Sequence, residues 1–142
     1  MTDSININSI EDLKEFVVKN LDSFLKPRQI ILLSGEMGAG KTEFVKQLLA
    51  AAGSDEVTSP SFGLHHTYSV RGVSIEHLDL FRLASEDDLH SVGFWDLFEN
   101  ENSLIIVEWA DRIVTHRIPM SWKKLSLQFE VLSVSRRRLQ IS

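Results

Sequence analysis

A glycine-rich segment from Gly35 to Thr42 contains the residues best suited to bind phosphate. Its sequence, GEMGAGKT, fits the spacing G-x-x-x-x-G-K-[ST] of the P-loop. Glycines let the backbone turn tightly, so that successive N–H groups can point into one concavity. A following helix would aim its positive end at the same place, with Lys41 on the outer phosphate oxygens and the Thr42 hydroxyl on magnesium. The segment therefore predicts a site for a polyphosphate and Mg2+.

The magnesium site of such a protein also needs a carboxylate, which usually ends a buried strand. Two acids have this place, because Glu108 follows the apolar run LIIV and Asp79 follows VSIEHL. Glu108 has the purer apolar run before it. The sequence leaves open which of the two contacts the metal directly. Either could instead cap a strand or pair with an arginine such as Arg82 or Arg112.

The segments on both sides of the loop predict the strand and the helix that a P-loop requires. Residues 29–35, QIILLSG, form a short apolar run that is typical of a strand buried on both faces. Residues 41–52 form a helical pattern, and Gly53 follows as a natural stop. The apolar face of this helix consists of Phe44, Val45, Leu48 and Leu49.

The remaining segments alternate between helical and strand patterns. Ser9 and Asp12 form a capping pattern at the start of a helix that is expected to end at Lys26-Pro27. Strands are expected over 73–79 and 104–107, short helices over 86–98, and a C-terminal hairpin over 123–132 and 136–142. Helices between buried strands predict an α/β fold of three layers, with a mostly parallel central sheet and helices on both faces.

Composition limits the classes of function that the chain can serve. A length of 142 residues with 43% hydrophobic residues suits one globular domain, which we expect to span residues 1–142. The net charge of -5 argues against direct binding of nucleic acid, which usually needs a basic protein. The chain has no cysteine, so disulfides and thiolate metal sites are excluded. With no signal sequence or membrane-length apolar run, we expect a cytoplasmic monomer.

The spaced set GEMGAGKT, SPSF, HLDLFR and VEWAD resembles the bacterial TsaE (YjeE) family over nearly the whole chain. Members of that family are small P-loop ATPases needed to make threonylcarbamoyladenosine (t6A) in tRNA. The resemblance implies a weak Mg2+-dependent ATPase with ATP or ADP as its bound nucleotide. It also implies that the protein works with the TsaB–TsaD pair, is stimulated by that pair, and meets tRNA only indirectly.

The same resemblance implies roles for individual residues. Thr42 and Glu108 would bind magnesium, and Lys41 and Glu108 would serve catalysis. Asp79 would orient or deprotonate the attacking water, and the Ser61 hydroxyl of SPSF would contact the γ-phosphate. One arginine of the run 136–138, taken as Arg137, would help bind the nucleotide. The remaining nucleotide contacts would come from Ser9, Gly35, Glu36, Met37, Gly38, Ala39, Gly40 and Trp109.

Three residues depart from the family pattern. Ser61 stands where Thr is common, which keeps the hydroxyl, and Phe81 stands where Tyr is common, which loses a phenol. Glu43 replaces a more usual Thr directly after Thr42. A carboxylate in the first helical turn suits the helix dipole but repels phosphate if it faces inward, so we expect Glu43 to face outward. These departures affect rate and affinity rather than the existence of the site.

Other conspicuous residues have simpler interpretations. His65 and His66 lack a second cluster with ligand spacing, so they do not indicate a metal site, and His77 is expected to orient Asp79. The aromatic residues within 94–98 suit the core but could also leave a patch for a partner. The arginine run 136–138 is typical of a solvated face, although such runs also bind RNA.

Two other functions remain open on the sequence. A small-molecule P-loop kinase would need an acceptor pocket and an arginine-bearing lid, for which the short chain and its plain C-terminal hairpin leave no evident room. A nucleotide-binding module without catalysis would tolerate exchange of Glu108 and Asp79. The fate of the γ-phosphate distinguishes an ATPase from a kinase, because only the ATPase releases free phosphate.

Overall fold

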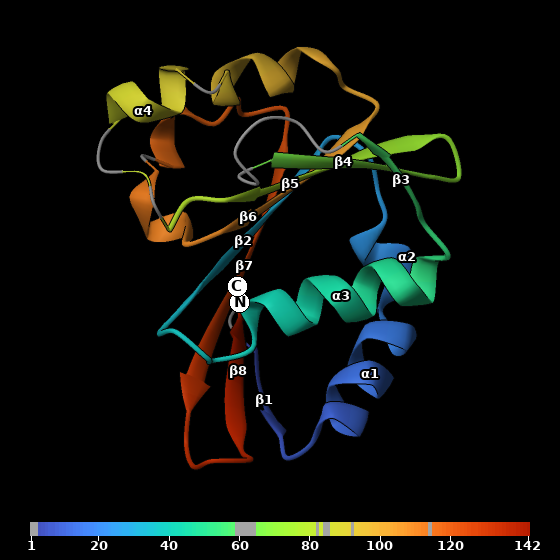
Figure 1. The fold of residues 1–142 in the computed structure, drawn as a ribbon, viewed down its shortest axis with the longest axis vertical. Coiled ribbons are helices and arrows are strands. Elements are labelled where there is room, and N and C mark those ends of the chain that lie inside the picture. Colours follow the sequence, from blue (N-terminus) through green and yellow to red (C-terminus); the bar gives the residue numbers. More distant parts are fainter. Residues whose placement is uncertain (1–2, 59–64, 82, 84–85, 92, 114) are drawn as a thin grey trace.

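The computed structural model describes residues 3–58, 65–81, 83, 86–91, 93–113 and 115–142. Within these residues, eight strands form one sheet in the order β1-β8-β7-β2-β6-β5-β4-β3 (Figure 1). The strands are β1 (Asp3–Ile7), β2 (Gln29–Gly35), β3 (Asp55–Thr58), β4 (His65–Val70), β5 (Val73–Asp79), β6 (Ser103–Glu108), β7 (Lys123–Val131) and β8 (Arg137–Ile141). The expected α/β class is confirmed.

The centre of the sheet is parallel and its two margins are antiparallel. Strands β7, β2, β6 and β5 pair in parallel, so their carboxyl ends meet at one edge. β8 and β1 extend one margin, while β4 and β3 extend the other, all by antiparallel pairing. The parallel centre and the C-terminal hairpin of β7 and β8 agree with the prediction. The register sets Glu108 of β6 opposite Leu33 of β2 and Asp79 of β5.

Helices cover both faces of the sheet, as predicted (Figure 1). One face carries α1 (Ile10–Lys19), α2 (Leu21–Phe24) and α3 (Lys41–Ala52). The opposite face carries α4 (Glu86–Ser91) and the short helices η2 (Phe94–Glu99), η3 (Ala110–Arg112) and η4 (Thr115–Arg117). Among the described residues, no helix combines the length and apolar character that a membrane crossing requires.

The first helix begins where the sequence predicts but ends earlier. The Ser9 hydroxyl oxygen accepts a hydrogen bond from the Asp12 amide at 3.1 Å, which satisfies one free N–H of the first turn. The helix that was expected to continue to Lys26 is divided at Asn20 into α1 and α2. The Asn20 side chain donates to the Phe16 carbonyl at 2.8 Å, and the Asn20 backbone N–H donates to the same oxygen at 3.2 Å, so Asn20 caps the end of α1.

Alternate residues of β2 divide the apolar core into two layers. Ile31 and Leu33 pack under α1 and α3, whereas Ile30 and Leu32 pack under the short helices of the opposite face. All four side chains are buried, which confirms the prediction of a strand covered on both faces. The aromatic run of η2 contributes to the second layer, as expected for core residues, through the buried rings of Phe94 and Phe98.

Candidate functional site

The loop between β2 and α3 is shaped by glycines that tolerate unusual backbone angles and close neighbours. Gly35 has a φ of 139°, and a Cβ there would lie 2.5 Å from the carbonyl oxygen of Phe129 on β7. Gly40 has a φ of 119° and precedes α3 as its N-cap, with the Phe129 ring 3.3 Å from the position of a Cβ. Side chains other than hydrogen would be strained at both positions, so the loop needs these glycines to reach the start of α3.

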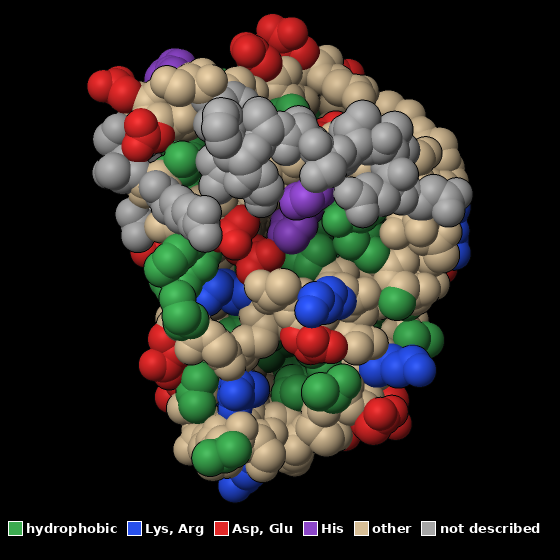
Figure 2. All heavy atoms as spheres, in the orientation of Figure 1, with side chains coloured by type: hydrophobic (Ala, Val, Ile, Leu, Met, Phe, Trp, Pro, Cys, Tyr) green, Lys and Arg blue, Asp and Glu red, His purple; other side chains and the backbone are tan. Residues whose placement is uncertain are grey.

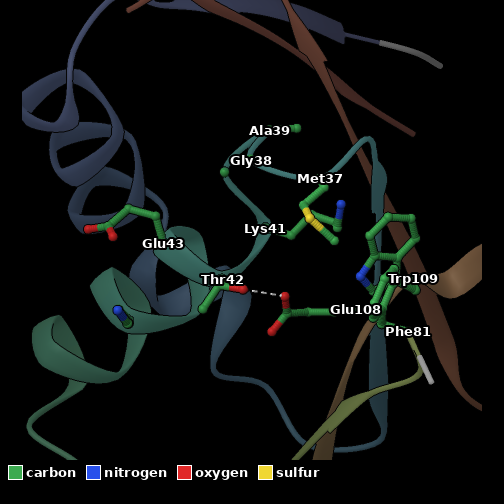
Figure 3. Close-up of a pocket in the computed structure, with 11 residues that line it drawn as sticks. Met37, Gly38, Ala39, Lys41, Thr42, Glu43, Phe81, Glu108 and Trp109 are labelled. Atoms are coloured by element: carbon green, nitrogen blue, oxygen red, sulfur yellow. Dashed lines mark hydrogen bonds between the residues drawn. The ribbon is translucent and has the colours of Figure 1, made fainter.

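A cavity of about 370 Å3, here called the loop cavity, opens at the N-terminus of α3 (Figure 3). It brings together residues that lie far apart in the sequence, and eight of them are predicted site residues: Met37, Gly38, Ala39, Gly40, Lys41, Thr42, Glu108 and Trp109. The complete lining consists of Met37, Gly38, Ala39, Gly40, Lys41, Thr42, Glu43, Lys46, Phe81, Glu108 and Trp109. The free amides at the start of α3 give this cavity the positive end of the helix dipole.

Thr42 and Glu108 meet inside the loop cavity. The Thr42 hydroxyl donates to Oε1 of Glu108 at 2.7 Å, which is the dashed contact in Figure 3. On the other side of the carboxylate, the His77 ring nitrogen Nε2 lies 2.6 Å from Oε2. The Glu108 side chain is only 3% exposed. Burial raises its pKa, but the hydrogen bonds from His77 and Thr42 and the charge of Lys41 outweigh burial and lower the pKa below its usual value.

These two oxygen ligands fit Mg2+. Mg2+ prefers hard oxygen donors, and proteins usually supply one or two carboxylates while substrate phosphates and water fill the remaining positions. The Thr42 hydroxyl and the Glu108 carboxylate lie side by side at the end of a buried strand, next to the loop amides. The carboxylate is ionised at neutral pH, since its pKa is lowered. The residues present therefore suit a magnesium ion held against a phosphate group.

Lys41 is held within its own loop. Its ammonium donates to the carbonyl oxygens of Gly35 and Glu36, at 3.0 Å for Glu36, and lies 4.0 Å from the centre of the Trp109 ring. Desolvation by burial lowers the pKa of Lys41, and nearby carboxylates led by Glu108 partly oppose that shift. Gly35 and Glu36 thus contribute carbonyl oxygens to the lysine, and they line a separate cavity beside β7.

Aromatic side chains form the outer wall of the loop cavity. Trp109 has a φ of 60°, a left-handed conformation that non-glycine residues rarely adopt, directly after Glu108. Its ring lies 4.9 Å from the ring of Phe81, and Met37 borders the same opening (Figure 3). Phe81 and Met37 are exposed at 41% and 68%. A strained backbone at this position is typical of functional sites, where the surrounding structure stabilises it.

Asp79 lies beside Glu108 in the parallel register, but its carboxylate has a different partner. Its Oδ1 accepts a hydrogen bond from the Phe81 amide at 3.0 Å, which begins the turn after β5. The expectation that His77 orients Asp79 is wrong, because the His77 ring contacts Glu108. His77 is opposite Ile106, so the diagonal neighbour on the same face of β6 is Glu108. Ser61 lies outside the described residues.

A second cavity of about 420 Å3, here called the helix–hairpin cavity, adjoins the loop cavity. It lies between the start of α1, the loop, and the turn that joins β7 to β8, and it contains the predicted residues Ser9 and Arg137. Arg137 donates to the Gly38 carbonyl at 3.1 Å and to the Ser133 carbonyl at 2.7 Å. The lining consists of Ile7, Ser9, Ile10, Leu13, Gly38, Ala39, Gly40, Glu43, Val134, Ser135 and Arg137.

The apolar lining of the helix–hairpin cavity was missed by sequence reasoning. Ile10 is 58% exposed and Val134 is 97% exposed, although both are apolar. The sequence holds a signal for an apolar binding surface at both positions. Ile10 directly follows the helix cap, and Val134 is a lone apolar residue in a polar turn. Their meeting depends on the pairing of β1 with β8, which brings the two ends of the chain together.

The fold and the loop geometry define the class of this molecule as an α/β protein with a P-loop NTPase-like fold. The family model described as "Threonylcarbamoyl adenosine biosynthesis protein TsaE" matches residues 7–139. The chain therefore belongs to the TsaE family, as its motifs indicate.

Individual relatives agree with this assignment. The tRNA threonylcarbamoyladenosine biosynthesis protein TsaE of Rickettsia felis is 33% identical over 137 residues, which cover 95% of this chain and 77% of the relative. The protein of the same name from Rickettsia bellii is 32% identical over 124 residues, covering 86% of this chain and 83% of the relative. The crystal structure of Bacillus subtilis YdiB superposes with a TM-score of 0.73 at 23% identity, covering 99% of this chain and 84% of YdiB. This likeness supports the fold.

Proposed function

We propose that this protein is a Mg2+-dependent ATPase that acts with the TsaB–TsaD pair in the synthesis of t6A in tRNA. The observation that carries the proposal is the contact of the Thr42 hydroxyl with the Glu108 carboxylate, at 2.7 Å, beside the loop amides. A P-loop NTPase holds its magnesium with a pair of this kind. The relatives from Rickettsia are named for threonylcarbamoyladenosine biosynthesis, which supports the proposed pathway.

The two adjoining cavities suggest how ATP would lie. The phosphates would occupy the loop cavity, where the amides of 38–42 and the helix N-terminus favour negative charge. The base would enter the helix–hairpin cavity and contact the apolar side chains of Ile10 and Val134. The Ser9 hydroxyl and the Arg137 guanidinium border that cavity and would supply its polar contacts. The shared loop residues would then lie beneath the middle of the nucleotide.

Four residues have a chemical task in this proposal: Lys41, Thr42 and Glu108 line the loop cavity, and Asp79 lies beside Glu108 in the register. Mg2+, held by Thr42 and Glu108, would neutralise charge on the β- and γ-phosphates. The Lys41 ammonium would exchange its two loop carbonyls for phosphate oxygens, which are better partners for a cation. A water molecule would attack the γ-phosphorus, and the bond from that phosphorus to the ADP oxygen would break. Asp79 would orient this water and accept its proton.

The expected hydrolysis without partners is slow. Among the described residues that line the loop cavity, the basic side chains are Lys41 and Lys46, and none is an arginine. In comparable enzymes an arginine supplied by a partner raises the rate about a thousandfold or more. Acidic and basic side chains are interspersed over the face in Figure 2, and the net charge is -5, which favours an indirect role for tRNA. The TsaB–TsaD pair is the proposed source of the stimulation.

Phosphate release from purified protein tests the proposal. We expect slow Mg2+-dependent conversion of ATP to ADP and phosphate, and a faster rate with TsaB–TsaD and tRNA. Lys41→Ala should abolish nucleotide binding, whereas Glu108→Gln should retain binding but lose hydrolysis, because it removes the anionic metal ligand. Absence of nucleotide binding at millimolar concentration, even with the partners, would overturn the proposal. A phosphorylated metabolite in place of free phosphate would identify a kinase.

A further inference from the structure

The loop cavity and the helix–hairpin cavity share a wall made of Gly38, Ala39, Gly40 and Glu43. Among these four described residues, Glu43 is the one with a charged side chain. It is half-buried and lies in the first turn of α3. Figure 3 shows its carboxylate pointing away from Lys41 and Thr42, towards α1. A negative charge therefore lies at the shared wall, on the side of the helix–hairpin cavity.

The position of this carboxylate is fixed by helix geometry and by one hydrogen bond. Glu43 belongs to the first turn of α3, so its backbone lies next to the loop. One turn further on, the Gln47 amide nitrogen donates to Oε1 of Glu43 at 2.9 Å. This hydrogen bond keeps the carboxylate half-buried beside the shared wall, where it points away from Lys41 and Thr42, as the sequence led us to expect.

The effect of the Glu43 charge on nucleotide binding rests on the proposed function. A nucleotide with its phosphates in the loop cavity and its base in the helix–hairpin cavity must cross this wall with its α-phosphate and ribose. We propose that Glu43 lowers the affinity of the site for ATP and ADP, relative to adenosine, by repelling the α-phosphate. Its charge also offsets part of the positive field at the α3 N-terminus, which is the main attraction of the loop for anions. The result is faster release of the ADP product.

A different role for Glu43 makes the opposite prediction. A carboxylate near a ribose can accept a hydrogen bond from a sugar hydroxyl, as acidic residues do in dinucleotide sites. In that case its removal would weaken binding of ATP, ADP and adenosine alike. Repulsion requires instead that removal of the charge strengthens binding of ATP and ADP and leaves adenosine unaffected. Whether the affinity for ATP and ADP rises or falls when the Glu43 charge is removed therefore decides between the two roles.

The experiment compares the parent protein with Glu43→Gln, which keeps the size of the side chain and an oxygen that can accept from Gln47. Calorimetry with ATP, ADP and adenosine, at low and high salt, gives the affinities. We expect Glu43→Gln to bind ATP and ADP about 3- to 10-fold tighter at low salt, with a smaller gain at high salt. Dissociation of ADP, followed by stopped-flow mixing, should slow by a similar factor.

Matched variants isolate the effect of charge at this wall. Glu15→Gln removes the same charge from the exposed face of α1, so its nucleotide affinity should equal that of the parent. Glu43→Ala removes the charge together with the side chain, and it should also tighten binding.

Unchanged or weaker ATP binding by Glu43→Gln would overturn the inference. Such a result for Glu43→Gln would leave the proposed function intact, provided that the parent binds ATP and Lys41→Ala does not. A parent that binds no nucleotide would overturn both.

Discussion

Substituting His77 tests how Glu108, the proposed magnesium ligand, is held in place. The His77 ring nitrogen Nε2 lies 2.6 Å from Oε2 of Glu108, and a carboxylate can only accept, so this nitrogen carries the proton. The Glu108 side chain is 3% exposed, so water cannot readily replace the lost donor in His77→Ala. Oε1 would keep its bond to Thr42, but the carboxylate would be free to rotate about that single contact. We expect weaker binding of magnesium.

The size of the expected loss in magnesium affinity follows from the type of contact between His77 and Glu108. A hydrogen bond to a charged group contributes about 1.5–3 kcal/mol, and about 1.4 kcal/mol corresponds to a factor of ten. Loss of a hydrogen bond to a metal ligand typically lowers metal affinity about 10- to 100-fold. We therefore expect His77→Ala to raise the magnesium concentration for half-maximal ATP hydrolysis about 10- to 100-fold. Binding of ADP without metal should change little, because His77 is not among the residues that line the loop cavity.

Two readouts make this prediction specific. Magnesium titration of hydrolysis gives the apparent metal affinity, and paramagnetic resonance of bound Mn2+ in the presence of ADP measures metal binding without turnover. His77→Gln can place an N–H donor near the carboxylate, so it should recover part of the loss. His90→Ala, on the exposed surface of α4, should behave like the parent. A folded His77→Ala protein with the metal requirement of the parent would refute the reasoning.

Two further substitutions test the loop and the acid stability of the sheet. Gly35→Ala should destabilise the fold by about 1–3 kcal/mol or more, since its Cβ would lie 2.5 Å from a β7 carbonyl oxygen at a φ of 139°; a parental free energy in urea unfolding would contradict this. Glu76 has a lowered pKa because hydrogen bonds outweigh burial; the donors are His65, Thr67 and Ser74. This stabilisation is present above the ordinary pKa of about 4.5 and is lost as pH falls through the lower folded pKa. Glu76→Gln should therefore show a shallower loss of unfolding free energy in that acidic range, and a parental slope would count against the assignment.

Much of the fold could be predicted where the sequence pattern is local. The strand Val73–Asp79 and the helix Lys41–Ala52 were predicted with the bounds that the structure has. Periodicity and helix caps act within one segment, so they are visible in the sequence. β1 was not predicted, because its mostly exposed and polar residues form a strand only through pairing with the distant β8. β3 and β4 likewise depend on antiparallel pairing at the opposite margin.

The candidate site likewise contains residues that the sequence predicts and residues that only the folded structure brings together. Lys41 and Thr42 were predicted from the spacing of the loop, and Glu108 and Asp79 were predicted as alternative acids from their places at the ends of strands. The partner of His77 could not be predicted, because it depends on the register between β5 and β6 and not on proximity to Asp79 along the chain. The helix–hairpin cavity was also hidden, since its walls come from segments that only the pairing of β1 with β8 brings together.

The pairing of β1 with β8 has a consequence for the order in which the site is completed during synthesis. Ribosomes make the chain from the N-terminus, so the loop and α3 emerge long before β8. Figure 1 shows the N- and C-terminal strands side by side, and Asp3 is aligned with Ile141. A nascent chain that lacks β8 also lacks Arg137 and the partner strand of β1. The helix–hairpin cavity is therefore complete only when translation has passed β8, so an incomplete polypeptide would lack the part of the site that is proposed to hold the base.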